Sequence, residues 1–249
     1  AMSTAALQSM FLRDPNGRQA EKYTFTVCLS VVLLCGVMAL ADGVFSLPYI
    51  PKSATKILSF AVAPLIIGAA WRDISPLSVF MMPAKDKKSR RAVFAFAACG
   101  GILLVGLIVG GYFLLRGIID FSAVTDNLAG GEGVTRENFP LVAAYITICN
   151  SFLEEFFFRG FAFLNLRRFA GRKFACIFSA AAFSVYHAAI LDGWFSPLML
   201  VLLLAGLFAG GLIFNILADK GDSIVPSWLL HMAANLGINI IGFILFGIL

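Results

Sequence analysis

Two adjacent carboxylates and a guanidinium lie in the middle of an apolar stretch of this 249-residue chain. Glu154, Glu155 and Arg159 fall within residues 141–166, a run long enough to cross a bilayer. A charge at the centre of a membrane helix costs roughly 2.5–3.5 kcal/mol, so three charges together require a reason. We expect Glu155 and Arg159, four residues apart on one helical face, to form an ion pair. Glu154 points about 100° away and has no local partner, which suits a general base, although a purely structural ion pair between helices is the alternative.

The only two histidines of the chain also lie in apolar segments. His187 follows Phe183 by four residues, and His231 precedes Asn235 by one helical turn, on the same face. A lone histidine in a membrane helix usually makes an interhelical hydrogen bond. Two histidines, an asparagine and an unpaired glutamate in three separate segments instead favour one shared cavity near the middle of the bilayer, open toward the cytoplasm.

These side chains are sufficient for hydrolysis of a peptide bond without a covalent intermediate. A carboxylate and an imidazole can share a water molecule and take its proton as it attacks a carbonyl group. A second imidazole and a carboxamide on one helical face can donate hydrogen bonds to the oxyanion that forms. The set Glu154, His187 and His231 could instead bind zinc with an open fourth position. The HExxH spacing of many zinc proteases is absent, and the residues alone leave both versions open.

Three motifs on successive apolar segments resemble those of the CAAX protease and bacteriocin-processing family, also called type II CAAX prenyl endopeptidases or Abi-domain proteins. The motifs are Glu154-Glu155-x-x-x-Arg159, Phe183-x-x-x-His187 and His231-x-x-x-Asn235. The resemblance extends over roughly residues 140–242, and the ordered trio is far more specific than any one motif. Signatures of serine-type (GxSG) and aspartyl-type (GxGD) intramembrane proteases are missing.

The resemblance implies an intramembrane endopeptidase in which Glu154 and His187 activate the water. It assigns His231 and Asn235 to the oxyanion site. Glu155 and Arg159 of the first motif support these residues. It also implies a glutamate mechanism without a cofactor, in place of the zinc metalloprotease mechanism long ascribed to such proteins. The expected partners are the lipid bilayer and a membrane-bound peptide or protein substrate, prenylated or not.

Two other functions compete with this prediction. The buried glutamate and histidines would also suit a proton relay in a small transporter, but the chain lacks the paired half-repeats of such carriers. A catalytically silent immunity or scaffold protein of the same fold is the second alternative, which the intact motif set disfavours.

Composition predicts an all-α, polytopic transmembrane helical bundle. Hydrophobic residues make up 60% of the chain and charged residues 13%, and the mean hydropathy is +0.90. The pattern indicates about seven spans, with room for an eighth, re-entrant or interfacial helix. The net charge of +5 does not indicate a nucleic-acid partner, because the basic residues lie between apolar runs. Five cysteines lack CxxC spacing and predict neither disulfides nor a metal site.

We expect three regions along the chain. Residues 1–23 form a cytoplasmic N-terminal segment with an interfacial helix, residues 24–139 the N-terminal spans and loops, and residues 140–249 the catalytic transmembrane core. The expected spans are 24–41, 55–71 (with a kink at Pro64), 92–115, 140–166, 174–190, 197–217 and 225–248.

Loop charges predict the orientation of this integral, multi-pass cell-membrane protein. With the N-terminus in the cytoplasm, inner segments hold 14 Lys and Arg residues, and outer segments hold four: Lys52, Lys56, Arg116 and Arg136. The C-terminus would then lie outside.

Two further patterns predict packing. Glycines of the third span mark close helix approach, at positions 100, 101, 106, 110 and 111, and Phe156, Phe157 and Phe158 are lipid-facing or packed.

Overall fold

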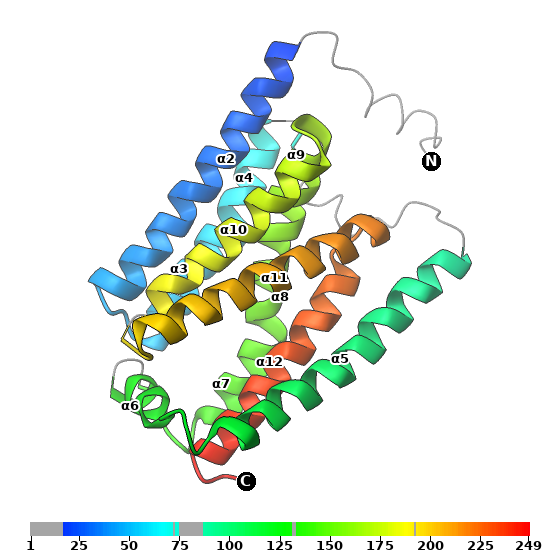
Figure 1. Ribbon diagram of the computed structural model, residues 1–249. Coiled ribbons are helices and arrows are strands. Elements are labelled where there is room, and N and C mark those ends of the chain that lie inside the picture. The colour runs from blue at the N-terminus through cyan, green and yellow to red at the C-terminus, as the bar shows by residue number, and fades with distance from the viewer. Residues whose placement is uncertain (1–16, 72, 75–86, 131–132, 192) are drawn as a thin grey trace.

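The computed structural model is a bundle of helices (Figure 1) and describes residues 17–71, 73–74, 87–130, 133–191 and 193–249. These residues contain no strand, as the composition predicts. The α-helices are α2 (Gly17–Ala39), α3 (Tyr49–Ile57), α4 (Ala63–Ala70), α5 (Lys87–Leu115), α6 (Ser122–Gly130), α7 (Phe139–Tyr145), α8 (Ser151–Glu154), α9 (Leu164–Phe169), α10 (Arg172–Leu191), α11 (Pro197–Gly221) and α12 (Val225–Leu245). Among the described residues, four π-helical segments join some of them into longer helices: η1 (Leu40–Val44), η2 (Leu58–Val62), η4 (Ile146–Asn150) and η5 (Glu155–Phe163).

Seven helices within the described residues are long and apolar enough to cross a membrane, which confirms the predicted number of spans. They are Gly17–Val44, Tyr49–Ala70, Arg91–Leu115, Phe139–Phe169, Arg172–Leu191, Pro197–Gly221 and Val225–Leu245. Of the predicted N-terminal segment, residues 1–16 lie outside the described residues, and so does its expected interfacial helix. The helix α2 already begins at Gly17.

The second span begins six residues before the predicted position. Pro48 adopts an extended conformation at the N-cap of α3, and Pro51 lies in the first turn, where a helix does not need a backbone N–H donor. Lys56 is therefore inside the span and not in a loop. Further along this span, Pro64 stands one residue inside α4. The π-helical turn η2 lies directly before it, where the missing N–H of proline leaves a carbonyl group of the preceding turn without its usual donor.

Helix starts elsewhere follow the same local chemistry. Proline occupies the first turn of α7, α11 and α12, where its fixed φ favours a helix and its missing donor costs nothing. The Ser196 side chain caps α11 by accepting a hydrogen bond from the backbone N–H of Met199 at 3.4 Å. Asp222 ends the same helix in the left-handed conformation, with φ of 46°.

The continuous helix Phe139–Phe169 is the centre of the bundle. Half of its most apolar window is buried, compared with 11–33% for the other six spans found in the described residues. Phe157 and Phe158 are fully buried, and the ring of Phe157 stacks on Phe60 of the second span at 4.2 Å between centroids. The run of phenylalanines is therefore core packing and not a lipid-facing surface.

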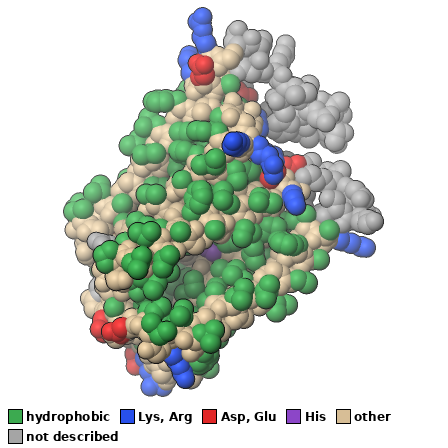
Figure 2. Space-filling model, in the orientation of Figure 1, with side chains coloured by type: hydrophobic (Ala, Val, Ile, Leu, Met, Phe, Trp, Pro, Cys, Tyr) green, Lys and Arg blue, Asp and Glu red, His purple; other side chains and the backbone are tan. Residues whose placement is uncertain are grey.

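The outer surface of the bundle is apolar. Large side chains such as Val32, Ile102 and Val201 are more than half exposed, as expected where lipid is the solvent. Figure 2 shows hydrophobic side chains over the middle of the visible face and charged side chains toward its ends. The five cysteines are all free. Which end of the bundle faces the cytoplasm stays a prediction.

Charged residues tie helices together at the end of the bundle where α9, α10 and α11 meet. Arg167 contacts Asp219 and Asp222 at 2.6 Å each, and Arg172 contacts Asp219 at 2.7 Å. This network fixes the two helices that follow the central helix, and so the position of α10.

Only two of the five third-span glycines that were predicted to pack closely against another helix do so. A Cβ atom at Gly101 would lie 2.9 Å from the Cβ of Ala233 on α12, and one at Gly100 would lie 3.8 Å from Leu230. At Gly106, Gly110 and Gly111 nothing lies within 4 Å, so the prediction is wrong for these three. Gly101 brings α5 directly against the helix that carries His231.

Candidate active site

Glu154 lies in the middle of the central helix, at a change of helical geometry. It ends the short α-helical turn α8, and π-helical segments precede and follow that turn. Such π-turns often occur at functional sites because they widen the helix and redirect its side chains. Glu154, Glu155 and Arg159 are all buried.

Glu154 has polar neighbours on both carboxylate oxygens. Its Oε1 accepts hydrogen bonds from Lys56 Nζ at 2.8 Å and from Asn150 Nδ2 at 3.1 Å. Its Oε2 faces Nε2 of His231 at 3.6 Å and Nε2 of His187 at 3.8 Å. The expectation that Glu154 lacks a cationic partner is therefore wrong, because it considered only neighbours on the same helix.

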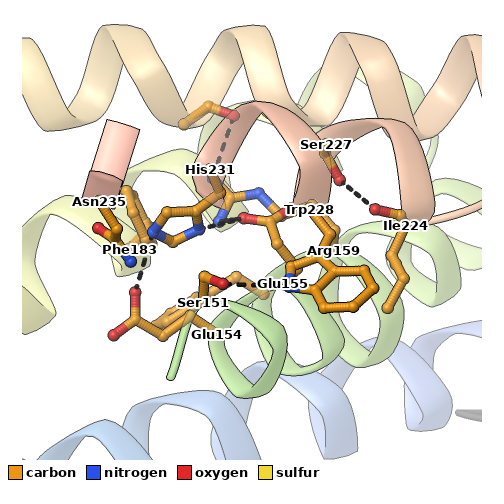
Figure 3. Close-up of polar contacts among 12 residues, drawn as sticks. Ser151, Glu154, Glu155, Arg159, Phe183, Ile224, Ser227, Trp228, His231 and Asn235 are labelled. Atoms are coloured by element: carbon orange, nitrogen blue, oxygen red, sulfur yellow. Dashed lines mark hydrogen bonds and ion pairs between the residues drawn. The ribbon is translucent and has the colours of Figure 1, made fainter. Parts of the chain in front are cut away.

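Both imidazoles are oriented through their Nδ1 atoms. In His187, Nδ1 lies 2.7 Å from the backbone carbonyl oxygen of Phe183, which requires Nδ1 to carry the proton. In His231, Nδ1 lies 2.9 Å from Glu155 Oε1. Figure 3 shows the His231 ring between the two glutamates, in contact with both. Each ring thus presents its Nε2 atom to Glu154. Residues of all three motifs therefore converge at Glu154, as the sequence predicts.

The pair Glu155–Arg159 forms as predicted from its spacing. Arg159 Nη1 lies 3.1 Å from Glu155 Oε1, and neither side chain is exposed. The guanidinium also donates to the carbonyl oxygen of Gly211 at 3.4 Å and lies over the ring of Phe183, 4.3 Å from its centroid. Arg159 therefore compensates the charge of Glu155 and links the central helix to α10 and α11.

Asn235 faces the central helix, one turn after His231. Its Nδ2 donates a hydrogen bond to the carbonyl oxygen of Ile146 at 3.0 Å, within the π-helical segment η4. One turn further on, Asn239 donates to Ala143 O at 3.0 Å and to Thr147 Oγ1 at 2.9 Å. One amide hydrogen of Asn235 thus serves to dock α12 on the central helix.

Sequence reasoning missed the two polar residues that hold Glu154 Oε1. Lys56 is 7% exposed and comes from the second span, while Asn150 is one turn before Glu154 on the central helix. The spacing from Asn150 to Glu154 was available in the sequence, since residues four apart share a helical face. The contact of Lys56 was not, because 98 residues separate it from Glu154.

The proposed zinc ligands do not fit a metal ion well in this arrangement. In the part of the chain that is described, no three His, Cys, Asp or Glu side chains are placed to hold one ion. The Lys56 ammonium, 2.8 Å from Glu154, would also repel a dication bound to the same carboxylate. The chemistry considered below accordingly uses only the side chains of the chain.

One histidine of the site is visible from the apolar flank of the bundle. Figure 2 shows a histidine side chain at the bottom of a hollow in the visible face, below α11. The side chain of His187 is 17% exposed, compared with 6% for His231 and 2% for Glu154. His187 therefore lies nearest the outside, and Glu154 is the most enclosed of the three. An opening at the predicted cytoplasmic end stays a prediction.

Comparison with known proteins agrees with this geometry. Residues 136–237 match the family described as type II CAAX prenyl endopeptidase Rce1-like. The chain has no significant match among curated proteins or among solved structures. The matched segment includes Glu154, both histidines and Asn235. At the level of the family, this match supports a CAAX-type intramembrane endopeptidase. The segment 136–237 is thus similar to the type II CAAX prenyl endopeptidase family, in agreement with the resemblance of its three motifs.

Proposed function

We propose that this protein hydrolyses a peptide bond of a membrane-associated peptide, with Glu154 as the general base. The observation that carries the proposal is the convergence of Glu154 Oε2 with Nε2 of His187 and Nε2 of His231, at 3.8 and 3.6 Å. The three side chains come from three different spans, inside an apolar bundle. A buried carboxylate that faces two oriented imidazoles suits acid–base chemistry better than it suits packing.

The distances around Glu154 Oε2 favour a water molecule as the nucleophile. They are too long for direct hydrogen bonds, and one water can bridge polar atoms at this separation. Held between Oε2 and His187 Nε2, the water attacks the carbonyl carbon of the substrate while its proton passes to Glu154. The same proton then goes to the leaving nitrogen as the C–N bond breaks.

The oxyanion of this reaction would be stabilised by His231 and Asn235. Glu155 accepts the Nδ1 proton of His231 and so stabilises a positively charged ring, whose Nε2–H can then donate to the oxyanion. The second amide hydrogen of Asn235, one turn further along α12, is the other donor. In this mechanism Glu155 and Arg159 do not touch the substrate.

The substrate class follows from where the site lies. A peptide must reach a carboxylate that is 2% exposed and enclosed by apolar spans, which favours a chain segment already anchored in the lipid. The hollow on the apolar flank provides such a route without passage through water. A lipid-modified or membrane-embedded C-terminal segment is therefore the substrate that we would test first.

The test is cleavage of a peptide library in lipid vesicles by purified protein. The library pairs C-terminal peptides that carry a prenylated cysteine with identical unprenylated peptides. Wild type is compared with Glu154→Gln, His187→Ala and the control Glu137→Gln, which alters an exposed carboxylate outside the spans. We expect Glu154→Gln to lose about 10²–10⁴-fold in kcat/KM and the control to keep full activity. Equal cleavage by wild type and Glu154→Gln would reject the proposed function.

A further inference from the structure

The buried ammonium of Lys56 is a polar group at the site that lies outside all three motifs. It comes from the end of α3, in a part of the chain that precedes the family match. We propose that Lys56 is a positioning residue, which holds Glu154 Oε1 so that Oε2 is presented to both histidines. This inference rests on the proposed role of Glu154 as general base.

Two hydrogen bonds and an aromatic ring hold the ammonium group of Lys56. An ammonium group has three N–H donors. Lys56 Nζ donates to Glu154 Oε1 at 2.8 Å and to Asn150 Oδ1 at 2.5 Å. It also stands 5.1 Å from the ring centroid of Tyr186, a position that favours a cation over the aromatic face. Because the ammonium contacts the Oε1 atom of Glu154 and not Oε2, Lys56 acts on Glu154 and not on the reacting atoms.

The carboxylate of Glu154 is thereby fixed in rotation. Asn150 bridges the pair, since it accepts from Lys56 and donates to the same Oε1 of Glu154 at 3.1 Å. Two donors on one oxygen hold the plane of the carboxylate and leave the other oxygen directed at the imidazoles. A general base is effective only within a narrow range of distance and angle to its proton, so this restraint bears directly on the rate.

Lys56 also supplies the permanent cation nearest to Glu154. Two neighbouring carboxylates are buried in an apolar bundle, and each has its own cation: Glu155 has Arg159 at 3.1 Å, and Glu154 has Lys56 at 2.8 Å. Without Lys56, Glu154 would be a buried charge next to another of the same sign, which is costly in a medium of low polarity. Lys56 thus permits the base to be ionised where it is needed.

The test compares Lys56→Met with Lys52→Met, using the peptide that the wild type cleaves best. Lys52 lies one turn earlier on the same helix and pairs with Asp42 at 2.7 Å, so its replacement removes an equal charge and an ion pair without touching Glu154. We expect Lys56→Met to lower kcat by about 10²-fold with little change in KM. Lys52→Met should keep the kcat of the wild type. Lys56→Arg, which retains the charge, should recover part of the loss.

Thermal unfolding in detergent provides a readout that does not depend on turnover. Lys56→Met and Glu154→Gln should each lower the midpoint, because each leaves the other side chain as an unpaired charge. The double variant leaves no unpaired charge, so it should lose less than the sum of the two. Full kcat in Lys56→Met beside an inactive Glu154→Gln would overturn the role of Lys56 and leave the proposed function standing. Undiminished cleavage by Glu154→Gln would instead overturn the proposed function and, with it, this role. Additive midpoints would show that the two side chains do not act as a pair.

Discussion

Glu155 Oε1 lies 2.9 Å from Nδ1 of His231, although 76 residues separate the two in the chain. The same oxygen lies 3.1 Å from Arg159 Nη1. One carboxylate oxygen therefore orients the imidazole of His231 and neutralises a buried guanidinium at once. This contact joins the first and third motifs, and we expect Glu155 to be needed for both the fold and the proposed reaction.

Replacing Glu155 should impair folding as well as catalysis. Glu155→Ala leaves Arg159 as an uncompensated charge inside the bundle and removes the support for His231. Breaking a buried ion pair on one side costs about 3–5 kcal/mol, so we expect a clear fall in unfolding temperature, folded yield and kcat. Normal expression and thermal stability of this variant, measured in detergent, would contradict the assignment.

Gly211 should tolerate no side chain, because Arg159 lies against it. A Cβ atom there would stand 3.1 Å from the Ala180 backbone and 3.3 Å from Arg159 Nη2. We expect Gly211→Ala to displace the guanidinium and lower stability by about 1–3 kcal/mol, with a loss of activity. Gly210→Ala is the matched control, since nothing lies within 4 Å of that position. Equal unfolding temperatures for the two variants would refute the packing argument.

A similar pair of variants on α5 tests how α12 is placed. Gly101→Ala would put a Cβ atom 2.9 Å from the Cβ of Ala233, whereas Gly106→Ala would meet nothing within 4 Å. We expect the first to push α12 outward, to cost about 1–3 kcal/mol and to reduce kcat, since His231 lies on that helix. The second should behave as wild type in unfolding and peptide-cleavage assays, and a loss in both variants would point to a different cause.

Replacing Asn235 and replacing Asn239 should have similar effects on stability but different effects on kcat. Both donate to backbone carbonyl groups of the central helix at 3.0 Å, so each replacement by alanine should cost about 1 kcal/mol of stability. Only Asn235 has an assigned oxyanion role, for which the loss is about 10²–10³-fold in kcat. The measurement is kcat relative to unfolding temperature for both variants. Parallel losses would reduce Asn235 to a docking residue.

Metal removal should leave peptide cleavage intact. The ammonium of Lys56 already compensates the charge of Glu154 at 2.8 Å, so the proposed reaction proceeds through side chains alone. We expect wild type dialysed exhaustively against chelator to retain its kcat, with metal content measured in the same sample. Loss of activity that returns only on addition of zinc would replace the glutamate mechanism with a metal-assisted one.

Much of this site could be predicted because its signals are local in the sequence. Apolar runs of sufficient length define the seven spans, and the four-residue spacing of Glu155 and Arg159 places them on one face. The convergence of Glu154 with both histidines followed from the scarcity of polar residues in such spans. That Phe157 is buried and not lipid-facing could not be predicted, since apolar side chains suit lipid and protein interior alike.

Lys56 shows where sequence reasoning failed. A lysine at the margin of an apolar run resembles a loop charge, and its true position depends on Pro48 and Pro51, which start the helix early. Its partner is 98 residues away, so neither helical periodicity nor motif spacing relates the two. The π-helical turns on either side of Glu154 were likewise invisible, because they arise from packing of the assembled bundle.

The same separation of 98 residues has a consequence for how the protein is made. During synthesis, the second span leaves the ribosome and enters the membrane well before the helix that carries Glu154 exists. For that interval Lys56 is a lone cation in a hydrocarbon environment, at a cost of roughly 2.5–3.5 kcal/mol on insertion scales. The nascent chain must therefore keep this span at the translocation machinery, or with its lysine extended to the headgroups, until the fourth span arrives.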